Sequence, residues 1–67
     1  MKIILNNRNE EFHQEQLTIN ELLAEKNFTF KMLVVKVNGE LVKRRDFDSV
    51  TIKDGDDVMV LHLITGG

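Results

Sequence analysis

The chain contains no cysteine, no proline, no tryptophan and no tyrosine among its 67 residues. Without cysteine it can form no disulfide, which fits a reducing compartment. No apolar run approaches the roughly 7–15 residues of a secretory signal or the roughly 20 of a membrane span. We therefore expect a cytoplasmic protein with no membrane partner, held together by a single hydrophobic core.

An excess of charge of one sign is also missing. The formal net charge is −2, from 9 basic and 11 acidic residues that are interspersed along the chain. The only basic cluster is Lys43-Arg44-Arg45, and Asp46 and Asp48 follow it at once. Arg44 and Arg45 could pair with acidic groups on a partner, but an exposed ion pair contributes only about 0–1 kcal/mol. We therefore interpret the cluster as a solvated turn. A nucleic-acid partner is not expected, since such proteins present a basic face.

Alternating apolar residues in the first part of the chain predict two strands. The first covers residues 1–6, with Met1, Ile3 and Leu5 on one face. A polar, asparagine-rich turn at 6–9 should lead into a second strand over 10–16. Its core residue would be Phe12.

The residues that follow contain two motifs typical of a helix N-terminus. Thr18 and Glu21 have the spacing of a capping box, and Leu17 and Leu22 that of a hydrophobic staple. Asn27 is a plausible terminator, so the helix should have about eight residues and needs packing to be stable. Its buried stripe is expected to contain Ile19, Leu22, Leu23 and the stem of Lys26.

The second half of the chain predicts three strands. Asn38-Gly39 is the strongest two-residue hairpin signal and follows a β-branched run. The expected segments are a strand over 33–37, a return strand over 40–43, an irregular stretch over 44–53 with one helical turn around 46–48, a turn at 54–56 and a strand over 57–64.

The resulting order is strand, strand, helix, strand, strand, strand. A single helix covers one face of a sheet, and the last strand should lie beside the first. This arrangement is an α+β, ubiquitin-like β-grasp fold with a mixed sheet. We expect residues 1–64 to form the domain and residues 65–67 a flexible C-terminal tail.

The side chains offer no recognisable catalytic or metal-binding constellation. Ser49 is the only serine, and His13 and His62 are far from it in sequence, so no nucleophile with a base is evident. His13 with Glu10 and Glu11 could bind a metal, but a lone histidine in a polar strand is far more often a surface residue. The chain is therefore expected to be no enzyme and to bind no metal. The backbone terminus remains as the candidate site.

The chain ends in Gly66-Gly67, directly after an apolar strand. Glycine lacks a Cβ, so two in succession form a thin strap that can approach another surface closely. Over essentially its whole length the chain resembles the thiamine-biosynthesis sulfur carriers, the ThiS group of ubiquitin-like proteins. The residues that carry this resemblance are Val37-Asn38-Gly39, Val42 with Arg44, Asp54-Gly55-Asp56, the apolar strand 58–64 and Gly66-Gly67.

The resemblance implies a definite chemistry at Gly67. An adenylating, ubiquitin-activating-like partner enzyme would use ATP to activate the Gly67 carboxylate, while the chain itself binds no cofactor. A persulfide donor would then supply the sulfur of a thiocarboxylate, which thiazole synthase would receive. Gly66, Thr65 and Ile64 would form the activation tail. The chain would be a monomer when free.

The last strand is apolar on both sides, although one helix covers only one face. We assign Val58 and Val60 to the core, with His62 near the inner rim. The outer, partner-binding surface is then expected to consist of Met59, Leu61 and Leu63. A register error of one residue would exchange the two faces.

Two other functions stay open at this stage. One is a sulfur carrier of another pathway, of the type of the small subunit of molybdopterin synthase, although such tails usually contain prolines. The other is a β-grasp binding module like those appended to RNA-associated GTPases, with an incidental Gly-Gly end.

Overall fold

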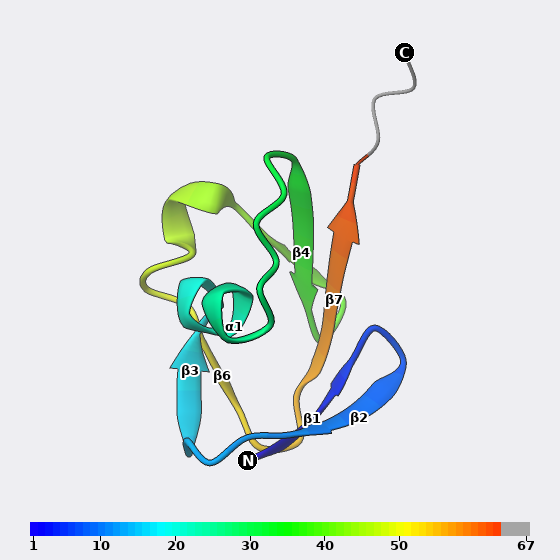
Figure 1. Ribbon diagram of the computed structural model, residues 1–67, viewed down its shortest axis with the longest axis vertical. Helices are drawn as coiled ribbons and strands as arrows, with labels where there is room; N and C mark the ends of the chain where they lie inside the picture. Colours follow the sequence, from blue (N-terminus) through cyan, green and yellow to red (C-terminus); the bar gives the residue numbers. More distant parts are fainter. Residues whose placement is uncertain (64–67) are drawn as a thin grey trace.

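The computed structural model describes residues 1–63 (Figure 1). The elements are β1 (Lys2–Leu5), β2 (Arg8–Glu11), β3 (Gln16–Thr18), α1 (Ile19–Glu25), β4 (Leu33–Val37), β5 (Glu40–Val42), the short 3-10 helix η1 (Arg44–Asp46), β6 (Thr51–Lys53) and β7 (Asp57–His62). Neither helix within residues 1–63 has the length and hydropathy that crossing a membrane requires.

The main sheet has five strands in the order β2-β1-β7-β4-β5. The last strand, β7, lies parallel to β1 and antiparallel to β4, which makes the sheet mixed. Helix α1 packs across one face (Figure 1). The predicted β-grasp fold, with the last strand beside the first, is therefore confirmed.

One apolar core lies between the sheet and α1. The helix contributes the predicted stripe, and the sheet contributes alternate residues of its central strands. The buried apolar residues are Ile3, Leu5, Leu17, Ile19, Leu22, Leu23, Val35, Phe47, Ile52, Val58 and Val60. The predicted inner face of the first strand is thus confirmed for Ile3 and Leu5, with the half-buried Met1 packed against the same core.

Both ends of α1 are fixed by local hydrogen bonds. The Glu21 amide donates to the Thr18 hydroxyl and the Thr18 amide to the Glu21 carboxylate, which confirms the capping box. Asn27 has φ 60°, and the amides of Asn27 and Phe28 donate to carbonyls of the last helical turn. This is a Schellman-type end, so the predicted terminator is confirmed as well.

The predicted second strand is present, but its predicted bounds, 10–16, were wrong. Asn6 and Asn7 both have positive φ, 51° and 67°, and form a two-residue turn of the kind that suits a tight hairpin. Pairing therefore resumes at once, with Arg8 opposite Leu5, and β2 ends before Phe12. Gln16 instead begins β3.

The stretch 44–53 is more regular than predicted. Its helical turn covers η1 rather than residues 46–48, and β6 follows it. β6 pairs with β3 in a separate two-stranded sheet, in which Leu17 lies opposite Ile52. The last strand also ends earlier than predicted, at His62.

Candidate functional site

The last strand ends at the edge of the molecule where the candidate tail begins. The Leu63 amide donates to the Met32 carbonyl over 3.0 Å, so the segment before β4 holds the chain just beyond β7. The four predicted tail residues, Ile64, Thr65, Gly66 and Gly67, lie outside the described residues.

β7 is anchored along its length as well as at its end. It lies in the middle of the sheet, between β1 and β4. The Asn6 side chain adds a further contact, because its Oδ1 accepts from the Val60 amide over 2.7 Å. β1 pairs only with the start of β7, at Asp57 and Val58, whereas β4 pairs with it as far as His62. The root of the tail is therefore set by backbone pairing with β4.

The two faces of β7 differ as predicted. Val58 and Val60 are buried in the core, whereas Leu61 is 44% exposed and Leu63 is 45% exposed. Met59 lies on the same side as Leu61 and is half-buried. The structure thus brings Met59, Leu61 and Leu63 to the uncovered side of the last strand.

Sequence reasoning missed two further apolar residues of that outer face. Ile4 is 40% exposed and Leu41 is 61% exposed. Ile4 alternates with the buried Ile3 and Leu5, and Leu41 is paired with Lys36, the residue opposite Met59. Strand alternation was the signal that could have found Ile4.

The helix side of the β7 end carries an aromatic cluster. The ring of His62 stacks on that of Phe30, with centroids 4.0 Å apart, and Phe30 stacks on Phe28 at 6.3 Å. These three rings line a hollow together with Val60 and other residues. The sequence placed His62 on this side but gave no sign of its aromatic partner.

The side chains considered as catalytic or metal-binding candidates form no such site within residues 1–63. The Ser49 hydroxyl donates to the Asp46 carbonyl over 3.2 Å and so closes the turn after η1. Within residues 1–63 no group of three or more histidine or acidic residues is placed to hold a metal ion. Arg44, interpreted from sequence as solvated, is exposed and also donates through Nη2 to the Lys31 carbonyl at 2.6 Å.

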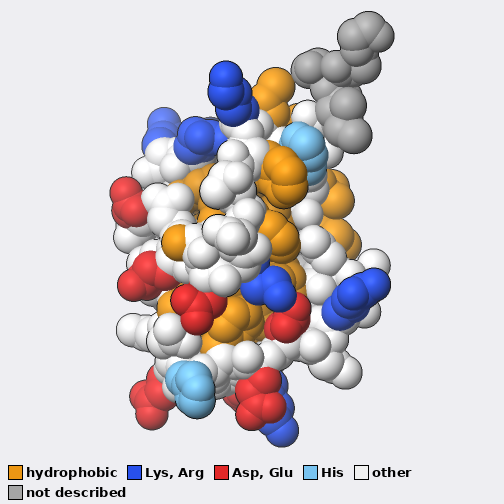
Figure 2. Space-filling model, in the orientation of Figure 1, with side chains coloured by type: hydrophobic (Ala, Val, Ile, Leu, Met, Phe, Trp, Pro, Cys, Tyr) orange, Lys and Arg blue, Asp and Glu red, His pale blue; other side chains and the backbone are white. Residues whose placement is uncertain are grey.

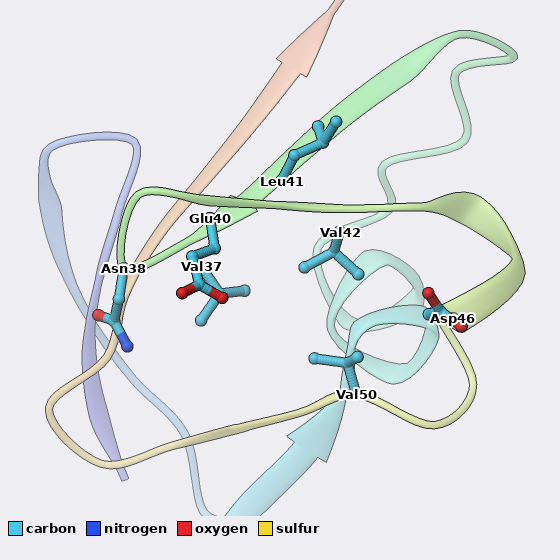
Figure 3. Close-up of a pocket in the computed structure, with 7 residues that line it drawn as sticks. All are labelled: Val37, Asn38, Glu40, Leu41, Val42, Asp46 and Val50. Carbon is cyan, nitrogen blue, oxygen red and sulfur yellow. The ribbon is translucent and has the colours of Figure 1, made fainter.

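A second hollow lies under β5, an edge strand of the main sheet. It is lined by Val37, Asn38, Glu40, Leu41, Val42, Asp46 and Val50. Figure 3 shows Val42 and Val50 facing one another across it, with the Glu40 and Asp46 carboxylates well apart. Its carboxylates do not converge on one point, so the hollow presents no paired acid-base arrangement.

The sequence model of the ThiS family matches residues 3–67, which is nearly the whole chain. The chain belongs to the ThiS family. The sulfur carrier protein ThiS of Bacillus subtilis (strain 168) is 27% identical over 63 residues, which cover 94% of this chain and 96% of that protein.

Solved structures agree with this assignment to the ThiS family. The crystal structure of a thiamine biosynthesis protein (ThiS) from Geobacter metallireducens matches with a TM-score of 0.90 and 33% identity, covering all of both chains. A solution structure of a thiamine biosynthesis protein from the same organism gives a TM-score of 0.81 at 33% identity, covering this whole chain and 88% of that one.

Two motifs that suggested the ThiS family meet in space. Asn38, in the β4–β5 turn, donates through Nδ2 to the Asp56 carboxylate over 3.0 Å and accepts from the Asp57 amide over 2.9 Å. The second Asp56 oxygen accepts from the Lys53 amide over 3.0 Å. The Asn-Gly and Asp-Gly-Asp turns therefore brace each other at the start of β7.

Proposed function

We propose that this chain is a sulfur carrier of thiamine biosynthesis, a protein substrate rather than an enzyme, with Gly67 as its working residue. The observation that carries the proposal is the match of the ThiS family along residues 3–67, which includes the terminal Gly-Gly. The name of the Bacillus subtilis relative, a sulfur carrier protein, supports the same function.

The proposed chemistry begins with activation of a poor electrophile. The Gly67 carboxylate attacks the α-phosphorus of ATP in the adenylating enzyme, and pyrophosphate leaves. A persulfide sulfur then attacks the acyl carbon and displaces AMP, which forms an acyl disulfide. A thiol reduces the S–S bond and leaves the thiocarboxylate, which passes its sulfur to thiazole synthase.

The fold supports a terminal site because β7 gives the tail a fixed root. Ile64, Thr65 and Gly66 would form the strap that carries Gly67 into the partner, where a glycine's missing Cβ permits close approach. Met59, Leu61 and Leu63 would contact the adenylating enzyme and thiazole synthase. Apolar side chains left exposed in this way commonly mark partner sites.

Intact-mass measurement tests the chemistry. Incubation with the adenylating enzyme of the same organism, ATP and a persulfide donor should add about 16 Da, the difference between sulfur and oxygen. A variant that lacks Gly66 and Gly67 is the matched control and should keep its mass. An unchanged mass of the intact chain, under conditions in which a known carrier gains sulfur, would contradict the proposal.

Complementation tests the pathway separately from the chemistry. The chain should restore growth of a thiamine-requiring strain that lacks its own carrier, and it should not restore a strain deficient in molybdenum cofactor. The opposite pattern would keep the sulfur chemistry and assign it to the molybdopterin pathway. Rescue that survives deletion of Gly66 and Gly67 would point to a binding module instead.

A further inference from the structure

Basic residues from two separate segments meet at the end of the molecule where β7 finishes. The 2.6 Å hydrogen bond from Arg44 to the Lys31 carbonyl joins the segment before β4 to η1. Lys and Arg side chains gather at this upper end in Figure 2. The basic end, as we name it, consists of Lys31, Lys43, Arg44 and Arg45, all of them exposed.

The acidic residues that follow the basic end in sequence, Asp46 and Asp48, form no ion pair with it. The Asp48 carboxylate accepts from Asn20 Nδ2 at the start of α1, over 2.5 Å. Asp46 is half-buried and lines the hollow under β5 (Figure 3). Among residues 1–63 the structure gives one ion pair, between Lys26 and Glu10, so none involves the basic end. A basic surface therefore exists on a chain whose net charge is −2.

Exposed apolar side chains lie at the same end. Phe30 is 42% exposed, Met32 is 48% exposed and Leu63 is 45% exposed. Phe30 stacks on His62, and the Met32 carbonyl accepts from the Leu63 amide, so all three surround the end of β7. Cations and apolar groups thus share the surface from which the chain continues toward Gly67.

We propose that the basic end docks on an acidic surface of the adenylating enzyme, beside the entrance to the site that receives the tail. This inference rests on the proposed function, since it requires that Gly67 enters a partner. Opposite charges across an interface steer encounter and fix orientation, and their effect falls as salt screens them. The nearby apolar groups favour a protein surface over a purely anionic one.

The test is ATP–pyrophosphate exchange catalysed by the adenylating enzyme of the same organism, with the carrier as varied substrate. The double variant Lys43→Glu, Arg45→Glu leaves the Arg44 bond in place. The matched control is Arg8→Glu, Lys53→Glu, on β2 and β6. Each variant takes the net charge from −2 to −6, because each substitution changes it by −2.

At low salt the double variant should lower kcat/KM for the carrier by about tenfold or more and leave kcat at saturation unchanged, because steering acts on encounter. The control should change kcat/KM by less than about twofold. The charge-keeping exchange Lys43→Arg, Arg45→Lys should retain the wild-type value. Wild-type kcat/KM should also fall with rising salt, more steeply than that of the double variant.

Two outcomes would overturn the inference. One is a wild-type kcat/KM that does not depend on salt, which needs no variant and so does not depend on how the variants fold. The other is an equal loss in both charge-reversal variants. Exchange that is absent with the wild-type chain would overturn the proposed function together with this inference, whereas normal exchange without charge dependence would overturn the docking surface alone.

Discussion

Asp56 is a carboxylate 9% exposed, and each of its oxygens has a donor. The sequence predicted both turns that meet here, since Asn38-Gly39 and Asp54-Gly55-Asp56 are strong turn signals. Positive φ at Asn38, Gly39 and Gly55 agrees with those predictions. The contact between the two turns could not be predicted, because local signals do not say which distant side chain a turn will face.

Replacing Asp56 should destabilise the protein more than replacing its exposed neighbour. Asp56→Ala leaves the Asn38 amide and the Lys53 amide without their acceptor, which should cost about 1–3 kcal/mol of unfolding free energy. Asp57→Ala is the control and should change stability by less than about 0.5 kcal/mol, because the Asp57 contact to Asn38 uses the backbone amide. Urea unfolding measures both, and equal stabilities would contradict the assigned bonds.

Elements that begin at a capping or turn motif could be predicted from the sequence. Short strands that are recognised only by their pairing with a distant segment could not. The Thr18–Glu21 capping box was enough to predict the start of α1, and the Asn38-Gly39 turn was enough to predict the β4–β5 hairpin. β3 and β6 have three residues each, and each contributes one buried residue, Leu17 or Ile52. Three residues carry too little alternation to mark a strand, so only the pairing of the two segments defines them.

Ile52 tests whether the small β3–β6 sheet belongs to the core. Its side chain is fully buried, so Ile52→Ala removes buried methyl groups and leaves a cavity, at an expected cost of about 2–5 kcal/mol. Ile4→Ala makes the same chemical change on a strand residue that is 40% exposed, and it should cost distinctly less. Thermal or urea unfolding compares the two. Similar losses would mean that β6 does not pack as described.

For the molecule as a whole, β7 is both the centre of the sheet and the root of the candidate site. Its two faces were predicted correctly, because compact β-branched Val58 and Val60 suit the core. The wider extent of the outer face was missed, since Ile4 and Leu41 join it only through strand order. Of the basic end, the sequence shows the Lys43-Arg44-Arg45 cluster, but only the fold brings Lys31 beside it.

The outer face of β7 can be tested with one charge placed at two positions. Leu61→Asp puts a carboxylate beside the root of the tail, where the partner enzymes are proposed to bind, and should lower kcat/KM for adenylation by about tenfold or more. Stability should change little, because Leu61 is 44% exposed. Leu41→Asp introduces the same charge on the edge strand β5, at a residue that is 61% exposed, and should have a smaller effect. Exchange kinetics measured beside urea unfolding separates lost docking from lost folding. Equal kinetics for the two variants and the wild-type chain would show that β7 is not part of the docking surface. A loss in Leu61→Asp alone would show that the strand from which the tail continues also contacts the partner enzyme.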